Sequence, residues 1–340
     1  MVEHDFSVGR SMTSRVYIVD ARDRDAAVRC LLREGFFGPC LPGGKGWVGT
    51  GVAEDSLTVA SEGVPAPPQA LSGKTVLLKA NFNSADPFPA STHLDTLRAL
   101  VAVMQEAGAG RVLVAERSGM GDTRQNLDKL GVLTLAAEMG FEVVVLDELT
   151  KGSWAHVKRG ETHWLRGFYL PKVVFEADVI IQTCCLKTHR FGGHFTMSLK
   201  NSVGLVAKKL PGSVYDYMWE LHGSPYQRLM IAEINAFYRV DFAVLDAARA
   251  FISGGPDKGA EVAPEVMLAS SDRVALDAAG LALLVDYRAS GLAKKPIFAH
   301  EQIRRAAELG VGAVSASEIE LIPLDERGRR VAERVMAFLQ

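Results

Sequence analysis

Cysteine is scarce in this sequence, and its spacing excludes several kinds of site. The 340 residues contain four cysteines: Cys30, Cys40, Cys184 and Cys185. Adjacent cysteines cannot form the C-x-x-C pair of a zinc or iron–sulfur site, and the other two are isolated in the sequence. We therefore expect free, buried thiols in a reducing compartment. A reactive thiolate at 184–185 is the alternative, because the nearby Lys187 and His189 would lower the pKa of a thiol.

Long apolar runs and a strong charge of one sign are also missing. No apolar stretch approaches the roughly 20 residues needed to cross a bilayer. The opening stretch, MVEHDFSVGRSMTSR, carries both charges and no apolar segment, so we expect no secretory signal. Lys and Arg number 38 against 40 Asp and Glu, and no Lys/Arg run exceeds a pair. We expect a cytoplasmic protein with no membrane and no nucleic-acid partner, and a homo-oligomer stays open.

The length of the chain allows one large α/β domain with additions, or two domains. At 340 residues it exceeds the usual size of one hydrophobic core, while 48% hydrophobic and 23% charged residues are typical of a globular protein. We predict an N-terminal strand and helix with a Gly/Pro-rich loop over 1–73. An α/β core over 74–290 and a C-terminal helical brace over 291–340 are predicted to follow.

The core is predicted to be an α/β domain with a mainly parallel, doubly wound (Rossmann-like) sheet. The near-continuous apolar run TVLLKA at 75–80 is typical of a strand buried on both faces. Further strands, separated by segments of helical periodicity, are expected at 111–116, 141–146, 178–182 and 241–245. Alternating segments around 155–157 and 163–170 predict a hairpin appended to this sheet.

One stretch, Glu176 to Lys209, gathers many groups that bind or react. Its apolar run at 179–181 predicts a short strand, followed by a polar loop and a helix. The polar groups are, in order, Lys187, Thr188, His189, Arg190, Gly192, Gly193, His194, Lys200 and Asn201. If the chain stays extended past the strand, Lys187 and His189 lie on one side and Thr188 on the other. The glycine pair suits a tight turn or a close approach of main chain to a ligand.

Several separated motifs together resemble one known family. They are LLKANFN at 77–83, STH at 91–93, LKTHRFGGHFTMSLKNSVGLV at 186–206, FISGGPDKG at 251–259 and SDRVALDA at 271–278. In this order, over roughly 74–290, they resemble the domain of unknown function 362 family. The resemblance implies an α/β fold and supplies no settled activity. Some members carry a ferredoxin-like segment with closely spaced cysteines. That segment is missing here, so we expect no iron–sulfur cluster, and a redox role is the poorer fit.

Four polar residues are predicted to fall just after core strands: His93, Asp122, His189 and Asp246. The carboxyl ends of parallel strands line one edge of a sheet, so we expect these residues to meet there. His93 also stands at the start of a helix predicted over 94–107 and capped by Thr92, whose free N–H groups suit an anion.

The main hypothesis is an enzyme acting on a small anionic metabolite that bears a carboxylate or a phosphate. Its ligand-binding candidates are His93, Asp122, Gly192, Gly193, Lys200, Asn201, Gly254 and Gly255. Lys187, His189 and Asp246 are the catalytic candidates, which would move a proton as in a racemase or lyase, or polarise a leaving phosphate. Lys200 lies within the first turn of its predicted helix. Its charge there opposes the helix dipole, which favours an anion between them.

Two other uses of these residues stay open. His189 and His194 could bind a divalent metal, with Asp122 or Asp246 as the carboxylate ligand. The stretch could also be a non-catalytic binding or scaffold surface, since charged loops are commonly solvated. Aromatic residues at 36–47 and 215–226 could act as lids over a site or pack protein surfaces together.

Overall fold

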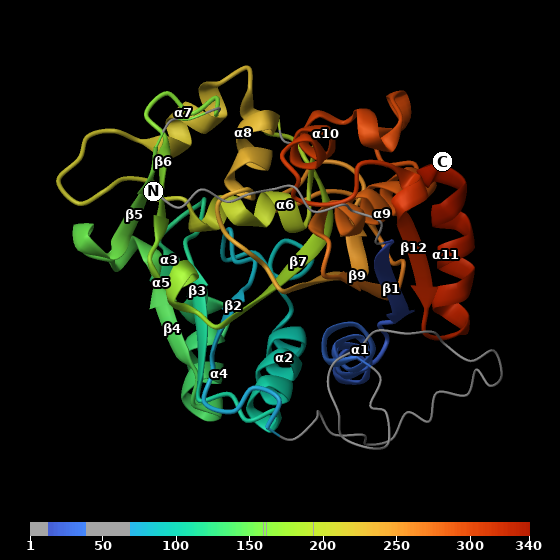
Figure 1. The fold of residues 1–340 in the computed structure, drawn as a ribbon, viewed down its shortest axis with the longest axis horizontal. Helices are drawn as coiled ribbons and strands as arrows, with labels where there is room; N and C mark the ends of the chain where they lie inside the picture. Colours follow the sequence, from blue (N-terminus) through green and yellow to red (C-terminus); the bar gives the residue numbers. More distant parts are fainter. Residues whose placement is uncertain (1–12, 39–68, 159, 161, 193) are drawn as a thin grey trace.

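The chain forms a large mixed sheet with helices on both faces (Figure 1). The computed structural model describes residues 13–38, 69–158, 160, 162–192 and 194–340. Within these residues the sheet has 10 strands. Its main path runs in the order β12 (Ile319–Pro323), β1 (Ser14–Asp20), β11 (Val266–Ser270), β9 (Phe242–Phe251), β7 (Val179–His189), β2 (Thr75–Lys79), β3 (Arg111–Glu116) and β4 (Glu142–Val145). Off this path, β10 (Glu261–Val262) pairs with β9 and β8 (His194–Thr196) pairs with β7.

The central strands of the sheet run parallel. β9, β7, β2, β3 and β4 are parallel neighbours, whereas β11 is antiparallel to both β9 and β1. A separate antiparallel hairpin consists of β5 (Trp154–Val157) and β6 (Phe168–Pro171). The predicted class, an α/β protein with a mainly parallel sheet and an appended hairpin, is confirmed.

Helices cover the two faces of the sheet. α1, α2 and α4 lie on one side of it, and α6, α8, α9 and α10 lie on the other (Figure 1). The α-helices are α1 (Arg24–Leu31), α2 (Leu94–Glu106), α3 (Thr123–Lys129), α4 (Val132–Met139), α5 (Val173–Glu176), α6 (Ser198–Asn201), α7 (Tyr217–Gly223), α8 (Gln227–Ile234), α9 (Arg273–Asp286), α10 (Glu301–Glu308) and α11 (Glu326–Leu339).

This arrangement explains why the strands are near-continuous apolar runs. In β2, Val76 and Leu78 belong to the core that includes α1 and α2, while Leu77 belongs to the core on the opposite face. None of these three side chains is more than 1% exposed. A parallel strand between two helical layers has no solvated face, so both sets of alternating side chains are apolar.

The predicted polar loop after the strand at 178–182 is wrong, because the strand continues. β7 runs through Lys187 and Thr188 to His189, and β8 folds back against its end. Lys187 is paired with Thr196 and His189 with His194 in this antiparallel register. The backbone groups of residues 187–189 find partners in β8, which keeps the segment extended.

Both ends of the described chain contribute to the same sheet. β1, from the predicted N-terminal part, pairs with β11 of the core and with β12 near the C-terminus. α11 packs against α9 and so covers the outer part of one face. Strands from all three predicted parts therefore share one sheet.

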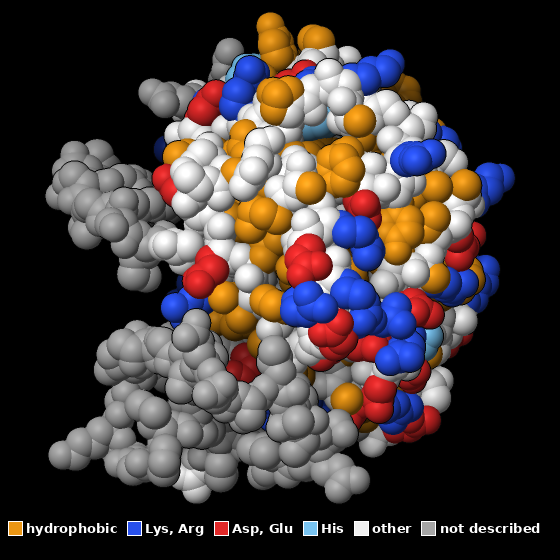
Figure 2. Space-filling view, turned by 90° about the vertical axis from the view of Figure 1, so that its right-hand side faces the viewer, with side chains coloured by type: hydrophobic (Ala, Val, Ile, Leu, Met, Phe, Trp, Pro, Cys, Tyr) orange, Lys and Arg blue, Asp and Glu red, His pale blue; other side chains and the backbone are white. Residues whose placement is uncertain are grey.

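The surface on the α11 side of the molecule carries basic and acidic side chains that are interspersed (Figure 2). On α11 itself, Arg329 forms ion pairs with Glu326 at 2.7 Å and Glu333 at 2.5 Å. In the described part of the chain, no helix combines the length and the apolar character needed to cross a membrane.

Candidate functional site

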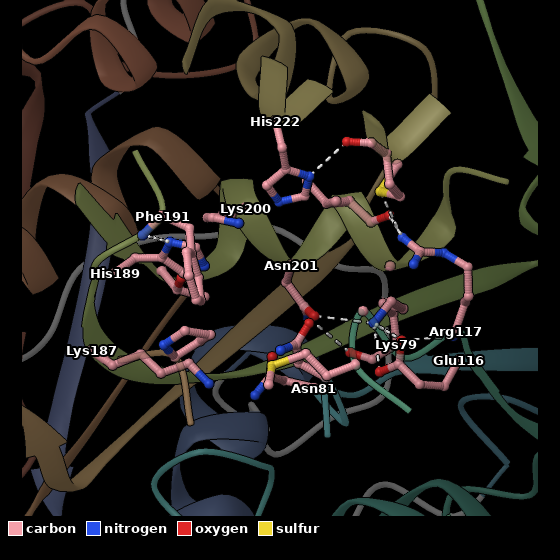
Figure 3. Close-up of a pocket in the computed structure, with 18 residues that line it drawn as sticks. Lys79, Asn81, Glu116, Arg117, Lys187, His189, Phe191, Lys200, Asn201 and His222 are labelled. Atoms are coloured by element: carbon pink, nitrogen blue, oxygen red, sulfur yellow. Dashed lines mark hydrogen bonds and ion pairs between the residues drawn. The ribbon is translucent and has the colours of Figure 1, made fainter. Parts of the chain in front are cut away.

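A cavity of about 250 Å³, which we call the main cavity, lies at the carboxyl ends of β2, β3 and β7. Its ionisable lining residues are Lys79, Glu116, Arg117, Lys187, His189, Lys200 and His222. In Figure 3, Lys187 and His189 lie on one side of the cavity and the Lys79–Glu116 pair on the other, with Asn201 between them. Four of the lining side chains are Lys or Arg and one is a carboxylate, so the cavity is strongly basic.

Lys79 and Glu116 form a buried ion pair at one end of the cavity. Lys79 Nζ lies 2.9 Å from each carboxylate oxygen of Glu116 and 3.0 Å from Oδ1 of Asn201. Glu116 also accepts hydrogen bonds from the backbone N–H groups of Phe82 at 2.9 Å and Arg117 at 2.8 Å. Both charges of this pair are thus compensated within the protein.

Gly204 brings the backbone close to this pair. A Cβ atom at Gly204 would lie 2.6 Å from Oε1 of Glu116 and 3.0 Å from Nζ of Lys79. The 3₁₀ turn Ser202–Leu205 can therefore approach the strand ends only because residue 204 has no side chain.

Arg117 is a buried cation whose donors go to carbonyl groups. Its guanidinium donates to the oxygens of Val206 at 2.9 Å, Val203 at 2.7 Å and Ser118 at 3.1 Å. No carboxylate of the described residues forms an ion pair with it, and burial lowers its pKa. Arg117 holds the backbone around the 3₁₀ turn in place, and the carboxylates of Asp147, Glu116 and Asp216 stabilise its charge through space without forming an ion pair with it.

Lys187 and Lys200 add two further buried cations. Lys187 Nζ donates to the backbone oxygen of Ala90. Among the described residues, no hydrogen bond or ion pair is formed by Nζ of Lys200, which is 8% exposed and lines the cavity. Burial lowers the pKa of both lysines; that of Lys200 falls to about 8, and Lys187 and Arg117 contribute to the fall. Three cations of the cavity therefore have no carboxylate partner in the described part of the chain.

Hydrogen bonds assign different roles to the two histidines of the cavity. Nδ1 of His222 lies 2.7 Å from the backbone oxygen of Met218, so Nδ1 carries the proton and Nε2 is an acceptor. Nδ1 of His189 accepts from the backbone N–H of Phe191 at 3.3 Å, so its Nε2 carries the proton. Burial lowers the pKa of each ring, so both are neutral near pH 7. His222 can accept a proton, and His189 can donate a hydrogen bond.

The start of α6, which carries Lys200, is held by a buried carboxylate. Asp277 of α9 accepts hydrogen bonds from the N–H groups of Ser198 at 2.8 Å and Leu199 at 3.0 Å. Burial raises the pKa of Asp277 to about 7. The anion that the sequence suggested at this helix start is therefore a side chain of the protein itself, and Lys200 points into the cavity (Figure 3).

The structure brings part of the predicted site together. Lys187, His189, Lys200 and Asn201 line the cavity described above. Alternate side chains of an extended segment were expected to point to opposite sides, and this is confirmed: Lys187 and His189 reach this cavity and Thr188 does not.

A second cavity, of about 430 Å³, lies against the other side of His189. His194 and Gly254 line it, together with Thr188 and Lys294. Of the remaining candidates, neither cavity is lined by His93, Asp122, Gly192, Asp246 or Gly255, and Gly193 lies outside the described residues.

His93 and Asp122 are helix caps. Nδ1 of His93 accepts from the N–H of Asp95 at 3.2 Å at the start of α2, where Thr92 had been expected as the cap. Asp122 accepts from the N–H of Gln125 at 2.8 Å at the start of α3. Both residues thus satisfy donors of their own helices.

Asp246 does not follow its strand, as the sequence had suggested, but lies within it. β9 extends to Phe251, and the side-chain partners of Asp246 come from α1 and α2, which lie on the sheet face opposite α6 (Figure 1). It forms an ion pair with Arg24 at 3.1 Å and accepts from Thr96 at 2.8 Å. The side chain is 1% exposed and its partners come from the protein, so it braces α1 and α2 against the sheet.

Several cavity residues were not singled out from the sequence: Lys79, Asn81, Glu116, Arg117 and His222. For Lys79 and Glu116 the sequence did carry a signal, which was a charged side chain at the end of an otherwise apolar strand. Burying such a charge is costly unless it is paired or binds a ligand. His222 and Met218 come from α7, so the aromatic segment 215–226 contributes to the cavity wall. Most of the other aromatic segment, 36–47, lies outside the described residues.

The proposed metal ligands His189 and His194 face each other across β7 and β8. No third ligand joins them: among the described residues, no three His, Cys, Asp or Glu side chains gather closely enough to hold a metal ion.

Comparison with solved structures finds a distant likeness. One match is the structure of the lactate racemase apoprotein from Thermoanaerobacterium thermosaccharolyticum, with 14% sequence identity and a TM-score of 0.40. It covers 72% of this chain and 53% of that chain, so this chain spans about half the length of that protein. No curated protein matches the sequence.

A family model matches much of the chain. The model is described as "Domain of unknown function (DUF362)" and matches residues 76–282. This segment begins in β2, ends in α9 and contains every lining residue of the main cavity. The chain belongs to the DUF362 family.

Proposed function

We propose that this protein is an enzyme that binds a small carboxylate- or phosphate-bearing metabolite in the main cavity and moves a proton on it. The observation that carries the proposal is the excess of buried cations. Arg117, Lys187 and Lys200 line the cavity, and none of them forms an ion pair with a carboxylate of the described residues. A bound anion would supply the missing charge.

The energetic cost of this arrangement supports a ligand. Moving a lysine or arginine from water into a protein costs several kcal/mol unless a charge or hydrogen bonds compensate it. Lys200 has neither among the described residues, and its lowered pKa is a measure of that cost. Lys79 shows the contrast, because this buried cation is paired with the carboxylate of Glu116.

The size and the neutral polar groups of the cavity suit a small metabolite. Its volume of about 250 Å³ lies below the roughly 300–1,000 Å³ of sites for drug-sized ligands. Asn81 lines the wall, and Thr196 has a buried hydroxyl with no partner in the described part of the chain. An unpaired buried hydroxyl is costly, so a ligand oxygen is its expected partner.

The two histidines fit proton transfer on such a ligand. His222 presents the acceptor Nε2, which can take a proton from a carbon next to a carboxylate. His189 presents Nε2–H, which can donate to the oxygen on which charge develops. Racemisation and elimination both begin with such a step. The same donors could instead hold a phosphate group.

Binding of anions is expected to stabilise the parent protein and to depend on Lys187 and Lys200. Thermal unfolding in the presence of acetate, succinate and phosphate measures this. A hydrogen bond to a charged group contributes about 1.5–3 kcal/mol, so Lys187→Met or Lys200→Met should weaken binding by about tenfold or more. Affinity should also fall as the pH rises through about 8, because Lys200 then loses its proton. Lys208→Met is the matched control, since Lys208 is exposed. Equal stabilisation of all variants would contradict the proposal.

Catalysis is expected to appear as exchange of a carbon-bound proton. A carboxylate that stabilises the protein is incubated with it in D₂O, and loss of the proton next to the carboxylate is followed by NMR. His222→Gln should slow exchange by about 100-fold or more, because a general acid–base group contributes at least that factor. His156→Gln is the control, since His156 is exposed on the hairpin. Binding without exchange in the parent would indicate a binding protein.

A further inference from the structure

We infer that Lys200 is a nucleophile that forms a covalent imine with the carbonyl carbon of a small carboxylate-bearing aldehyde or ketone, such as a 2-oxo acid. The inference rests on the proposed anion-binding function. It adds to that function the class of substrate and the attacking atom.

Lys200 differs from the other lysines of the cavity in having no partner. Lys79 is paired with Glu116 at 2.9 Å, and Lys187 donates to the backbone oxygen of Ala90. In the part of the chain that the structure describes, Nζ of Lys200 forms neither an ion pair nor a hydrogen bond, and the residue is 8% exposed. Its amine is therefore the one free to attack a bound molecule.

The surroundings of Lys200 favour the neutral amine. The charged and titratable groups that face it are Lys187 and His189 of β7, Arg117 after β3 and His222 of α7. Glu116, the carboxylate of the same wall, is taken up by Lys79. Burial and the neighbouring cations lower the pKa of Lys200 to about 8, so about a tenth of the amine is unprotonated near pH 7. Neighbouring cations and desolvation are the established means of activating a lysine nucleophile.

Lys200 is also held in a defined position. It lies in α6, whose first two N–H groups donate to Asp277 at 2.8 Å and 3.0 Å. The next residue, Asn201, donates to the backbone oxygens of Thr183 and Lys79 at 3.1 Å and 3.3 Å. These contacts fix the backbone on both sides of Lys200, which limits the orientations of the amine.

The groups of the cavity fit the steps of imine formation. His222 Nε2 takes a proton from the ammonium of Lys200, and the lone pair of Nζ then forms a bond to the carbonyl carbon while the C=O π pair moves to oxygen. His189 donates a hydrogen bond to that oxygen, which takes a proton from solvent. The adduct nitrogen then releases one of its two protons to solvent, and its lone pair forms the C=N bond while the hydroxyl group leaves as water with the proton held by His222, which gives a protonated imine. Overall, one amine and one carbonyl give one imine and one water.

The carboxylate of the substrate stabilises the product. In this proposal it lies between Lys187 and Arg117, neither of which forms an ion pair with a carboxylate of the described residues, and a protonated imine adds a positive charge beside it. The apolar side chains of Phe191, Val203 and Met218 line the same cavity and reduce the access of water that would hydrolyse the imine.

Reductive trapping tests the inference on the full-length protein. Pyruvate and glyoxylate are each added with sodium borohydride, and the adduct is measured by intact mass and located by peptide mapping. We expect one reduced adduct per chain, located on Lys200 of the parent protein. Lys200→Arg, which keeps the positive charge, should lower adduct formation by at least tenfold, and Lys208→Arg should leave it unchanged. Acetate, which has no ketone or aldehyde carbon, should give no adduct.

Two results would overturn the inference. One is an adduct spread over exposed lysines or located on Lys187. The other is the absence of an adduct although pyruvate and acetate both raise the unfolding temperature of the parent. That second result leaves the proposed anion binding intact, so the two proposals can fail separately. If none of pyruvate, acetate, succinate and phosphate stabilises the parent and pyruvate gives no adduct, both are wrong.

Discussion

Replacement of Lys200 by methionine is expected to raise the free energy of unfolding by about 3 kcal/mol near pH 7, because the variant no longer buries an unpaired cation. Burial, with contributions from Lys187 and Arg117, lowers the pKa of Lys200 from 10.5 to about 8. The unfolded chain keeps the ordinary pKa, so the folded state binds this proton less tightly. Methionine is similar in length and fills the volume without a charge.

The gain should depend on pH with a definite sign. Below about pH 8 both states of the parent carry the proton, so the full cost of burial is present. Between about 8 and 10.5 the folded parent loses the proton before the unfolded chain does. The stability of the parent then rises relative to the variant, and the difference shrinks toward zero. Urea unfolding over this pH range measures it.

A matched variant tests the cause of this gain. Lys208 follows α6 closely in the sequence but is exposed, so Lys208→Met should change stability little at any pH. If Lys200→Met is less stable than the parent near pH 7, or if its effect is independent of pH, Lys200 is not a destabilising buried cation. A stabilising substitution that also removes anion binding would be the expected sign of a residue kept for function.

Glu116→Gln is expected to lower the free energy of unfolding by about 3–5 kcal/mol, since it leaves buried Lys79 without a counter-charge. Glu116 is 2% exposed and Lys79 1%, so water cannot replace the lost contact. In the parent the carboxylate accepts hydrogen bonds from the N–H groups of Phe82 and Arg117. The NH₂ group of glutamine would instead point a donor at one of these N–H groups or at the ammonium of Lys79. Equilibrium unfolding in urea measures the change.

The neighbouring strands offer a control for this prediction. Arg111 and Glu142 form an ion pair at 2.9 Å between β3 and β4, with 57% and 55% of their side chains exposed. Glu142→Gln should therefore cost less than about 1 kcal/mol. The double change Lys79→Met with Glu116→Leu should recover much of the loss, because it removes both buried charges. Similar small effects of Glu116→Gln and Glu142→Gln would show that the buried pair is not needed for stability.

The architecture was accessible from local patterns. TVLLKA in β2 and RVLVAE in β3 are apolar on both faces, and this pattern occurs where a parallel strand is covered by two layers of helices. The antiparallel position of β11 was not predictable in this way. Strand direction is set by connections and pairing between distant segments, which the apolar pattern of a single strand does not encode.

The candidate site was accessible only where its members are close in sequence. Lys187, His189, Lys200 and Asn201 share one stretch and one cavity. Arg117 follows β3 and His222 lies in α7, and their arrival at the same cavity depends on how those elements pack. The spacing of these residues along the sequence does not indicate how close they lie in the fold.

Placement errors came from the ends of strands. Lys187 and His189 were placed in a loop and lie in β7, and Asp246 was placed after a strand and lies inside β9. In both cases pairing with a neighbouring strand lengthens the element, and tertiary contacts override the local pattern at such boundaries. The extension decides where this candidate residue lies, because the alternation of side chains along β7 directs Lys187 into the cavity.

The sequence by itself determined the α/β class, the family and one basic stretch, because hydrophobic periodicity and linear motifs are properties of neighbouring residues. The tertiary structure decided which cations are compensated. Lys79 meets Glu116 across two strands, while Lys200 meets no counter-charge among the described residues. That difference arises from burial and distances between segments, and it is what separates a structural lysine from a candidate reactive one.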